Sequence, residues 1–233
     1  MRSEFLLGGE PLYSLKRRRP PGRGRRHLGL PAFSWRLSAK VGLGLFVVLL
    51  AASAYVAGRE HLLYFGRYPG PWLLTAIVLV VTAVPIMLLI HRFHQFRRKP
   101  AWTMVVAVLW GGPIALTMAI YGNTYLLAHL ERVMSPAAYD AWSLAIAAPV
   151  VEEPIKAAGI VLLFLLSGRR FRSPLDGLVY GSAVGFGFQA AENVLYSLTA
   201  ASASPAGARL TAVLTSFAER IFLSGILSHT LYT

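Results

Sequence analysis

Charged residues are scarce in this sequence. Only 14% of the 233 residues are Asp, Glu, Lys or Arg, whereas a soluble domain carries about 25%. The hydrophobic share is 55%, and several apolar runs reach about 20 residues, the length needed to cross a bilayer core roughly 30 Å thick. The shortage of charge therefore excludes an ordinary soluble domain and predicts a membrane protein.

Cysteine is absent, which excludes disulfides, thiol nucleophiles and cysteine-ligated zinc. Acidic residues are also few, so the net charge is +13. Such a charge indicates nucleic-acid binding only when it forms a patch on a soluble domain. Here the basic residues flank apolar runs, so membrane topology and anionic lipid headgroups explain them better, and we expect no nucleic-acid partner.

Six apolar spans predict an all-α fold, a polytopic bundle of transmembrane helices. The predicted spans are 38–58, 71–91, 101–121, 141–167, 175–199 and 213–233. Before them, residues 1–37 are basic and broken by Pro and Gly, and we expect a disordered cytoplasmic tail. We interpret 38–140 as a three-span scaffold and 141–233 as a three-span catalytic region. Because the last span has no polar flank, we expect this region to be incomplete at its C-terminal end.

Lys and Arg alternate between the two sides of these spans. Seventeen of them fall in residues 1–40 and the segments 92–100 and 168–174, and only four fall in the other segments between spans. The positive-inside rule then predicts a multi-pass protein of the plasma membrane with a cytoplasmic N-terminus. The basic tail would face the anionic headgroups of the bilayer.

Carboxylates occur where a membrane helix should have none. Glu152 and Glu153 lie in the middle of the fourth span, and Lys156 follows them by four and three residues, on the same helical face. Two adjacent carboxylates do not both ionise easily in a low dielectric, so Lys156 would neutralise one and leave the other as a general base, proton shuttle or metal ligand. Pro154 would kink the helix and admit water. The alternative is a structural ion pair that joins two helices.

The fifth and sixth spans carry further polar groups. Glu192 follows Phe188 by four residues, and Asn193 adds an amide beside it. Arg220 could pair with a buried carboxylate, and His229 could bind a metal or share a proton. The alternative for Glu192 and Asn193 is a packing role, and the alternative for His229 is a hydrogen-bonded packing residue.

A stripe of small residues and two charged positions have structural interpretations. Gly177, Gly181 and Gly185 recur every four residues and favour close helix packing. The negative charge of Asp176 would interact favourably with the positive end of the dipole at the start of the fifth helix. Glu219 would mark the membrane interface.

The order of these motifs resembles the PrsW family of glutamate-dependent intramembrane proteases. The resemblance covers about 145–233 and rests on Glu152-Glu153-x-x-Lys156, then Phe188-x-x-x-Glu192-Asn193, then Arg220 and His229. The related CAAX-prenyl and bacteriocin-processing proteases have Arg at the position of Ala157 and His at that of Glu192, so the PrsW branch fits better. The resemblance implies a bacterial intramembrane endopeptidase that cleaves membrane-bound proteins such as anti-sigma factors.

The site that this resemblance implies has four catalytic candidates, supported by Lys156, Phe188, Asn193 and Arg220. The four candidates are Glu152, Glu153, Glu192 and His229, which are also the candidate ligands of a divalent metal, zinc before others. Glu152 or Glu153 would activate water, while Glu192, His229 and Asn193 would position it or stabilise the oxyanion. The alternative function is a non-catalytic scaffold or a proton- or ion-coupled carrier that uses the same carboxylates.

Overall fold

The computed structural model describes residues 35–95, 100–167 and 173–222, and helices are the only regular secondary structure there, as predicted. The chain divides into two units, 1–34 and 35–233, and the second holds all the helices described here. The helices are α1 (Trp35–Arg67), α2 (Pro69–Gln95), α3 (Ala101–Leu109), the π-helix η2 (Trp110–Ala115), α4 (Leu116–Val133), α5 (Pro136–Ser167), α6 (Pro174–Ala203), the short 3₁₀ helix η4 (Ala206–Ala208) and α7 (Arg209–Phe222).

The helices are longer than the predicted spans. The segment 59–70, expected to be a loop, is helical up to Arg67 and again from Pro69. The expected loop 122–140 is helical up to Val133 and again from Pro136. Hydropathy detects only the apolar part of a helix. The helical backbone extends beyond that part into the neighbouring polar residues.

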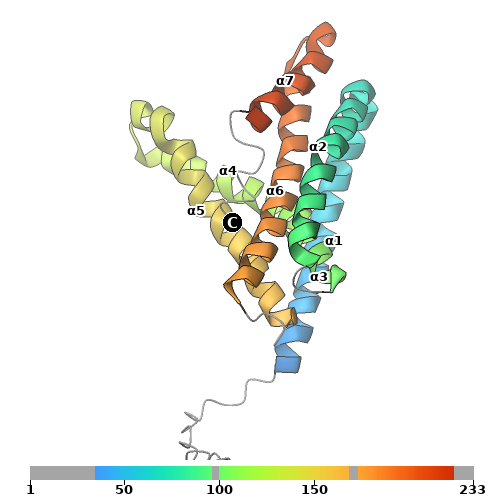
Figure 1. Ribbon diagram of the computed structural model, residues 1–233. Helices are drawn as coiled ribbons and strands as arrows, with labels where there is room; N and C mark the ends of the chain where they lie inside the picture. Colours follow the sequence, from blue (N-terminus) through green and yellow to red (C-terminus); the bar gives the residue numbers. More distant parts are fainter. Residues whose placement is uncertain (1–34, 96–99, 168–172, 223–233) are drawn as a thin grey trace, which may run out of the picture. The chain divides into compact units, whose positions relative to one another are not determined.

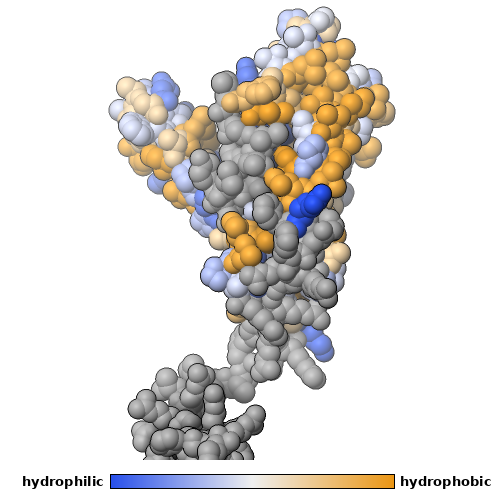
Figure 2. All heavy atoms as spheres, viewed as in Figure 1, coloured by the Kyte–Doolittle hydropathy of each residue, from blue (hydrophilic) through white to orange (hydrophobic). Residues whose placement is uncertain are grey.

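Apolar side chains cover much of the outside of these helices. Three stretches are long and apolar enough to cross a membrane, namely Ala39–Arg67, Pro69–Ile90 and Ala101–Val133. Figure 2 shows orange, hydrophobic residues on the visible surface. Large apolar side chains that are more than half exposed include Val48, Val81 and Leu144. An apolar surface of this extent suits contact with lipid. Among the described residues, α5 and α6 do not meet the same criterion of length and composition, because they carry the polar and charged groups.

The third predicted span is one continuous helical segment that contains a π-helical turn, η2. Pro113 lies inside η2 and has no N–H to donate, so the regular α-helical ladder cannot continue through it. This turn crosses α6 backbone to backbone: a Cβ added to Gly111 would clash with the carbonyl of Val184, and one added to Gly187 would clash with that of Val108. Glycine is therefore required at this crossing.

Helix α6 lies between α5 and α2 in Figure 1 and also contacts η2, α3 and α7. A capping box begins it, because Ser173 and Asp176 each accept a hydrogen bond from the backbone N–H of the other. Trp110 of η2 packs against α5. Its indole fills the space beside Gly159 and donates a hydrogen bond of 2.9 Å to the carbonyl of Ile155.

Candidate active site

Lys156 is the centre of a polar cluster on α5. Its Nζ lies 3.3 Å from Glu152 Oε2 and 2.8 Å from Glu153 Oε1, so Lys156 contacts both carboxylates, whereas we expected it to neutralise one and leave the other free. Lys156 is fully buried and Glu152 is only 7% exposed, whereas the Glu153 side chain is 41% exposed. Both ion pairs lie within one helix, so Lys156 does not join two helices through them. The helix continues through Pro154 without a break.

Asn123 of α4 connects this cluster to a second helix. Its Nδ2 donates a hydrogen bond of 3.2 Å to Glu152 Oε1, while Lys156 holds the other carboxylate oxygen. The neighbouring Gly122 makes this contact possible, because a Cβ at that position would come within 2.5 Å of Val151 Cγ1 on α5. The absence of a side chain at Gly122 thus brings Asn123 to Glu152.

A second polar cluster joins α6 to α7. Arg220 makes an ion pair with Glu192 through Nη2, and its Nε donates a hydrogen bond of 2.6 Å to Asn193 Oδ1. The guanidinium also lies 4.4 Å from the centre of the Tyr196 ring. A guanidinium can only donate, so it fixes the amide oxygen of Asn193 toward itself and turns the amide NH₂ away.

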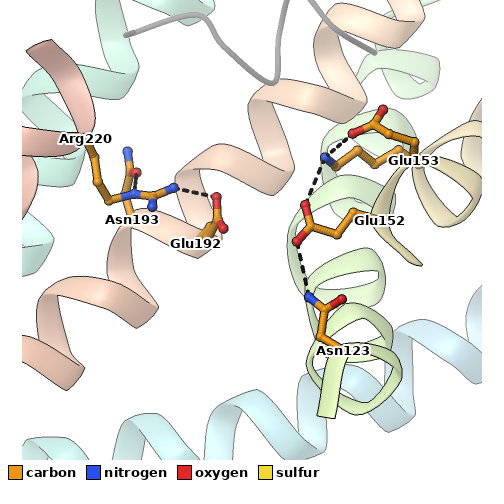
Figure 3. A network of polar contacts seen from close by, with 7 residues as sticks. Asn123, Glu152, Glu153, Glu192, Asn193 and Arg220 are labelled. Carbon is orange, nitrogen blue, oxygen red and sulfur yellow. Dashed lines mark hydrogen bonds and ion pairs between the residues drawn. The ribbon is translucent and has the colours of Figure 1, made fainter. Parts of the chain in front are cut away.

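The two clusters approach one another. Glu152 and Glu192 extend toward one another from α5 and α6 (Figure 3), and both residues are at least 92% buried. Phe188 lies between the helices, with its ring centre 4.1 Å from Lys156 Nζ. A buried cation beside an aromatic face is stabilised by the ring quadrupole. The site therefore consists of two carboxylates, each paired with its own cation.

Most of the predicted site residues come together. Glu152, Glu153 and Lys156 form the first cluster, and Phe188 contacts it. The predicted pairing of Arg220 with a buried carboxylate is present at Glu192. His229 lies outside the described residues.

Three other positions can be compared with their structural interpretations. Asp176 takes part in the capping box, which agrees with its role at the helix start. Glu219 is exposed on α7, directly before Arg220 in the sequence. In the small-residue stripe of α6, Gly181 and Gly185 are buried, but the close backbone crossing described above occurs at Gly187.

Asn123 was not predicted. The sequence interpretation placed it in a loop, because the apolar run of the third span ends near residue 121. In the structure, α4 continues to Val133 and carries Asn123 along its face toward α5. The available signal was the pair Gly122-Asn123, a small residue beside an amide in a segment that remains helical.

The described residues alone do not form a metal site. They contain no group of three or more His, Asp or Glu side chains placed to hold an ion. Glu152 and Glu192 are instead engaged by Lys156, Asn123 and Arg220. The described donor set therefore does not fit a metal without a further ligand.

Comparison with known proteins supplies a family. The sequence model of the PrsW family of intramembrane metalloproteases matches residues 99–233, which is more than half of the chain and includes both clusters. No curated protein and no solved structure matches the chain.

Proposed function

This chain belongs to the PrsW family of intramembrane metalloproteases, and from that premise we propose that it hydrolyses peptide bonds of membrane-bound proteins. We propose Glu152 and Glu192 as its catalytic residues. The family makes the chain a membrane protease and hence a hydrolase. The observation that carries the assignment of residues is the pair of buried carboxylates that extend toward one another from α5 and α6.

Glu152 is our candidate general base. It is buried, and its two oxygens accept from Asn123 and Lys156, so its orientation is restrained from two directions. A base oriented in this way can take a proton from water as the water oxygen attacks the scissile carbonyl carbon, and can return that proton to the leaving amine. Glu153 shares Lys156 but is much more exposed, so we assign it a supporting role.

Glu192 and Asn193 are our candidates for positioning the reacting groups. Glu192 can accept a hydrogen bond from the attacking water, while Arg220 keeps its carboxylate charge balanced. The amide NH₂ of Asn193 faces away from Arg220 and offers donors for the oxyanion of the tetrahedral intermediate. Arg220 is then a positioning residue that orients both side chains.

The family name implies a metal, and zinc is the ion for which a set of Glu and His ligands is typical. The described residues do not complete such a set, so we assign no step to a metal. A metal site would depend on His229 joining Glu152 and Glu192. Metal analysis of the purified wild type and of a His229→Ala variant tests this, and equal metal contents would exclude His229 as a ligand.

We assign the substrate class and the topology on the same basis. Membrane-bound proteins of the anti-sigma-factor type are the proposed substrates, and the plasma membrane with a cytoplasmic N-terminus is the proposed setting. One contact agrees with the alternation of sides, though not with either orientation in particular: the Arg209 guanidinium lies 4.6 Å from the centre of the Tyr68 ring. The segments 59–70 and 200–212, which the charge pattern assigns to the same external side, therefore do meet.

Cleavage of a single-span anti-sigma factor, co-expressed with a tag at each end, tests the assignment. We expect Glu152→Gln and Glu192→Gln to reduce the cleaved fraction at least 100-fold, because each removes a carboxylate but keeps the shape. Glu219→Gln is the matched control, since Glu219 is exposed and takes no part in the ion pairs of the two clusters. Full cleavage by Glu152→Gln would refute its role as the base.

A further inference from the structure

A cavity lies on another face of α6 from the carboxylates. Its volume is about 620 Å³, and α1, α4 and α6 supply most of its lining. On α6 the lining residues run from Gly187 to Leu198 at helical spacing, whereas Phe188, Glu192 and Asn193 face the candidate active site. The cavity is therefore separate from the catalytic groups proposed above.

The shape of this cavity limits what can fill it. The lining of α6 runs from Gly187 to Leu198, eleven rises of 1.5 Å or about 17 Å along the helix. This is close to one leaflet, which is half of a hydrocarbon core roughly 30 Å thick. An extended acyl chain of a phospholipid spans one leaflet, so the length of the cavity suits one such chain.

The lining is polar at one end only. Val108, Leu109 and Gly112 line the deep end, and Glu60 and His61, near the C-terminus of α1, line the other end together with Tyr121 of α4. Trp72 donates a hydrogen bond of 3.3 Å to His61 Nδ1, so the neutral imidazole carries its proton on Nε2. This end therefore offers one carboxylate and one N–H donor.

We propose that this cavity binds one acyl chain of a phospholipid whose headgroup carries a primary amine, that is, a phosphatidylethanolamine. The chain fills the apolar length of the cavity, where it buries hydrocarbon against the three helices. The ammonium group pairs with Glu60, and the phosphate accepts a hydrogen bond from His61 Nε2. Among the described residues, Glu60 has no ion-pair partner of its own.

Native mass spectrometry of the full chain, delipidated and then incubated with equal amounts of phosphatidylethanolamine and phosphatidylglycerol, tests this proposal. We expect wild type to retain one lipid and to prefer phosphatidylethanolamine. Ala57→Phe and Thr117→Phe fill the cavity from α1 and α4, and each should reduce retention at least tenfold. Ala54→Phe is the matched control, because Ala54 is exposed on the same helix outside the cavity.

Each outcome bears on a separate part of the proposal. Wild type without bound lipid, or equal loss in Ala54→Phe and Ala57→Phe, overturns the site. Two filling variants from different helices guard against a folding defect in one of them, and retention by both would also overturn the site. Glu60→Gln should abolish the preference between the two lipids, and an unchanged preference overturns the headgroup assignment.

Discussion

Replacing Gly122 by alanine should disable the active site from outside it. The new Cβ would lie 2.5 Å from Val151 Cγ1, while carbon atoms in contact are normally about 3.5–4.0 Å apart. Valine in a helix has one strongly preferred rotamer, so Val151 cannot turn its methyl group away at low cost. Helices α4 and α5 must therefore separate by about 1 Å.

The same separation would break the hydrogen bond that orients Glu152. The distance from Asn123 Nδ2 to Glu152 Oε1 is 3.2 Å, and an increase of about 1 Å takes it beyond the range of a hydrogen bond. A hydrogen bond to a charged group contributes about 1.5–3 kcal/mol. If that orientation is used in the transition state, the cleavage rate should fall by a factor of roughly 10 to 150.

Three variants in the reporter cleavage assay separate this mechanism from general damage. Gly122→Ala should lose activity, and Gly122→Ala with Val151→Ala should recover most of it, because the second change removes the clashing methyl group. Gly44→Ala in α1 is the control, since nothing lies within 4 Å of a Cβ there. Wild-type rates in Gly122→Ala, or no recovery in the double variant, would refute the reasoning.

Two further predictions concern stability and topology. Lys156→Met should lower the free energy of unfolding by about 3–5 kcal/mol, because it leaves buried Glu152 without its cation. Unfolding in detergent measures this change, and Lys40→Met is the control because Lys40 is exposed. Equal unfolding midpoints for the two variants would contradict the prediction. Because the chain has no cysteine, a single cysteine at Ser204 can be labelled specifically, and we expect an impermeant thiol reagent to reach it from outside the cell; labelling only after lysis would reverse the proposed topology.

Local geometry explains which parts of the site could be predicted. The ion pairs of Lys156 with Glu152 and Glu153 follow from residue spacing on one helix, so the sequence was sufficient for them. The helical fold was also predictable, because apolar runs of spanning length have few alternatives in lipid. Arg220 was identified as a possible partner of a carboxylate, and the structure places it at Glu192.

Contacts between helices were harder to predict from the sequence. The hydrogen bond from Asn123 to Glu152 joins residues 29 positions apart and depends on how closely α4 approaches α5. The crossing at Gly187 lies outside the regular glycine stripe of α6, so a simple repeat did not identify it. Both contacts depend on the three-dimensional approach of helices, which hydropathy and spacing do not encode.

The crossing of η2 and α6 also has a mechanical consequence. At Gly111 and Gly187 each backbone packs directly on the other, so there are no side chains at this point that could change rotamer. Any shift of α6 relative to η2 must therefore move whole backbone segments, and it would carry Glu192 with it, because Glu192 lies on α6 shortly after Gly187.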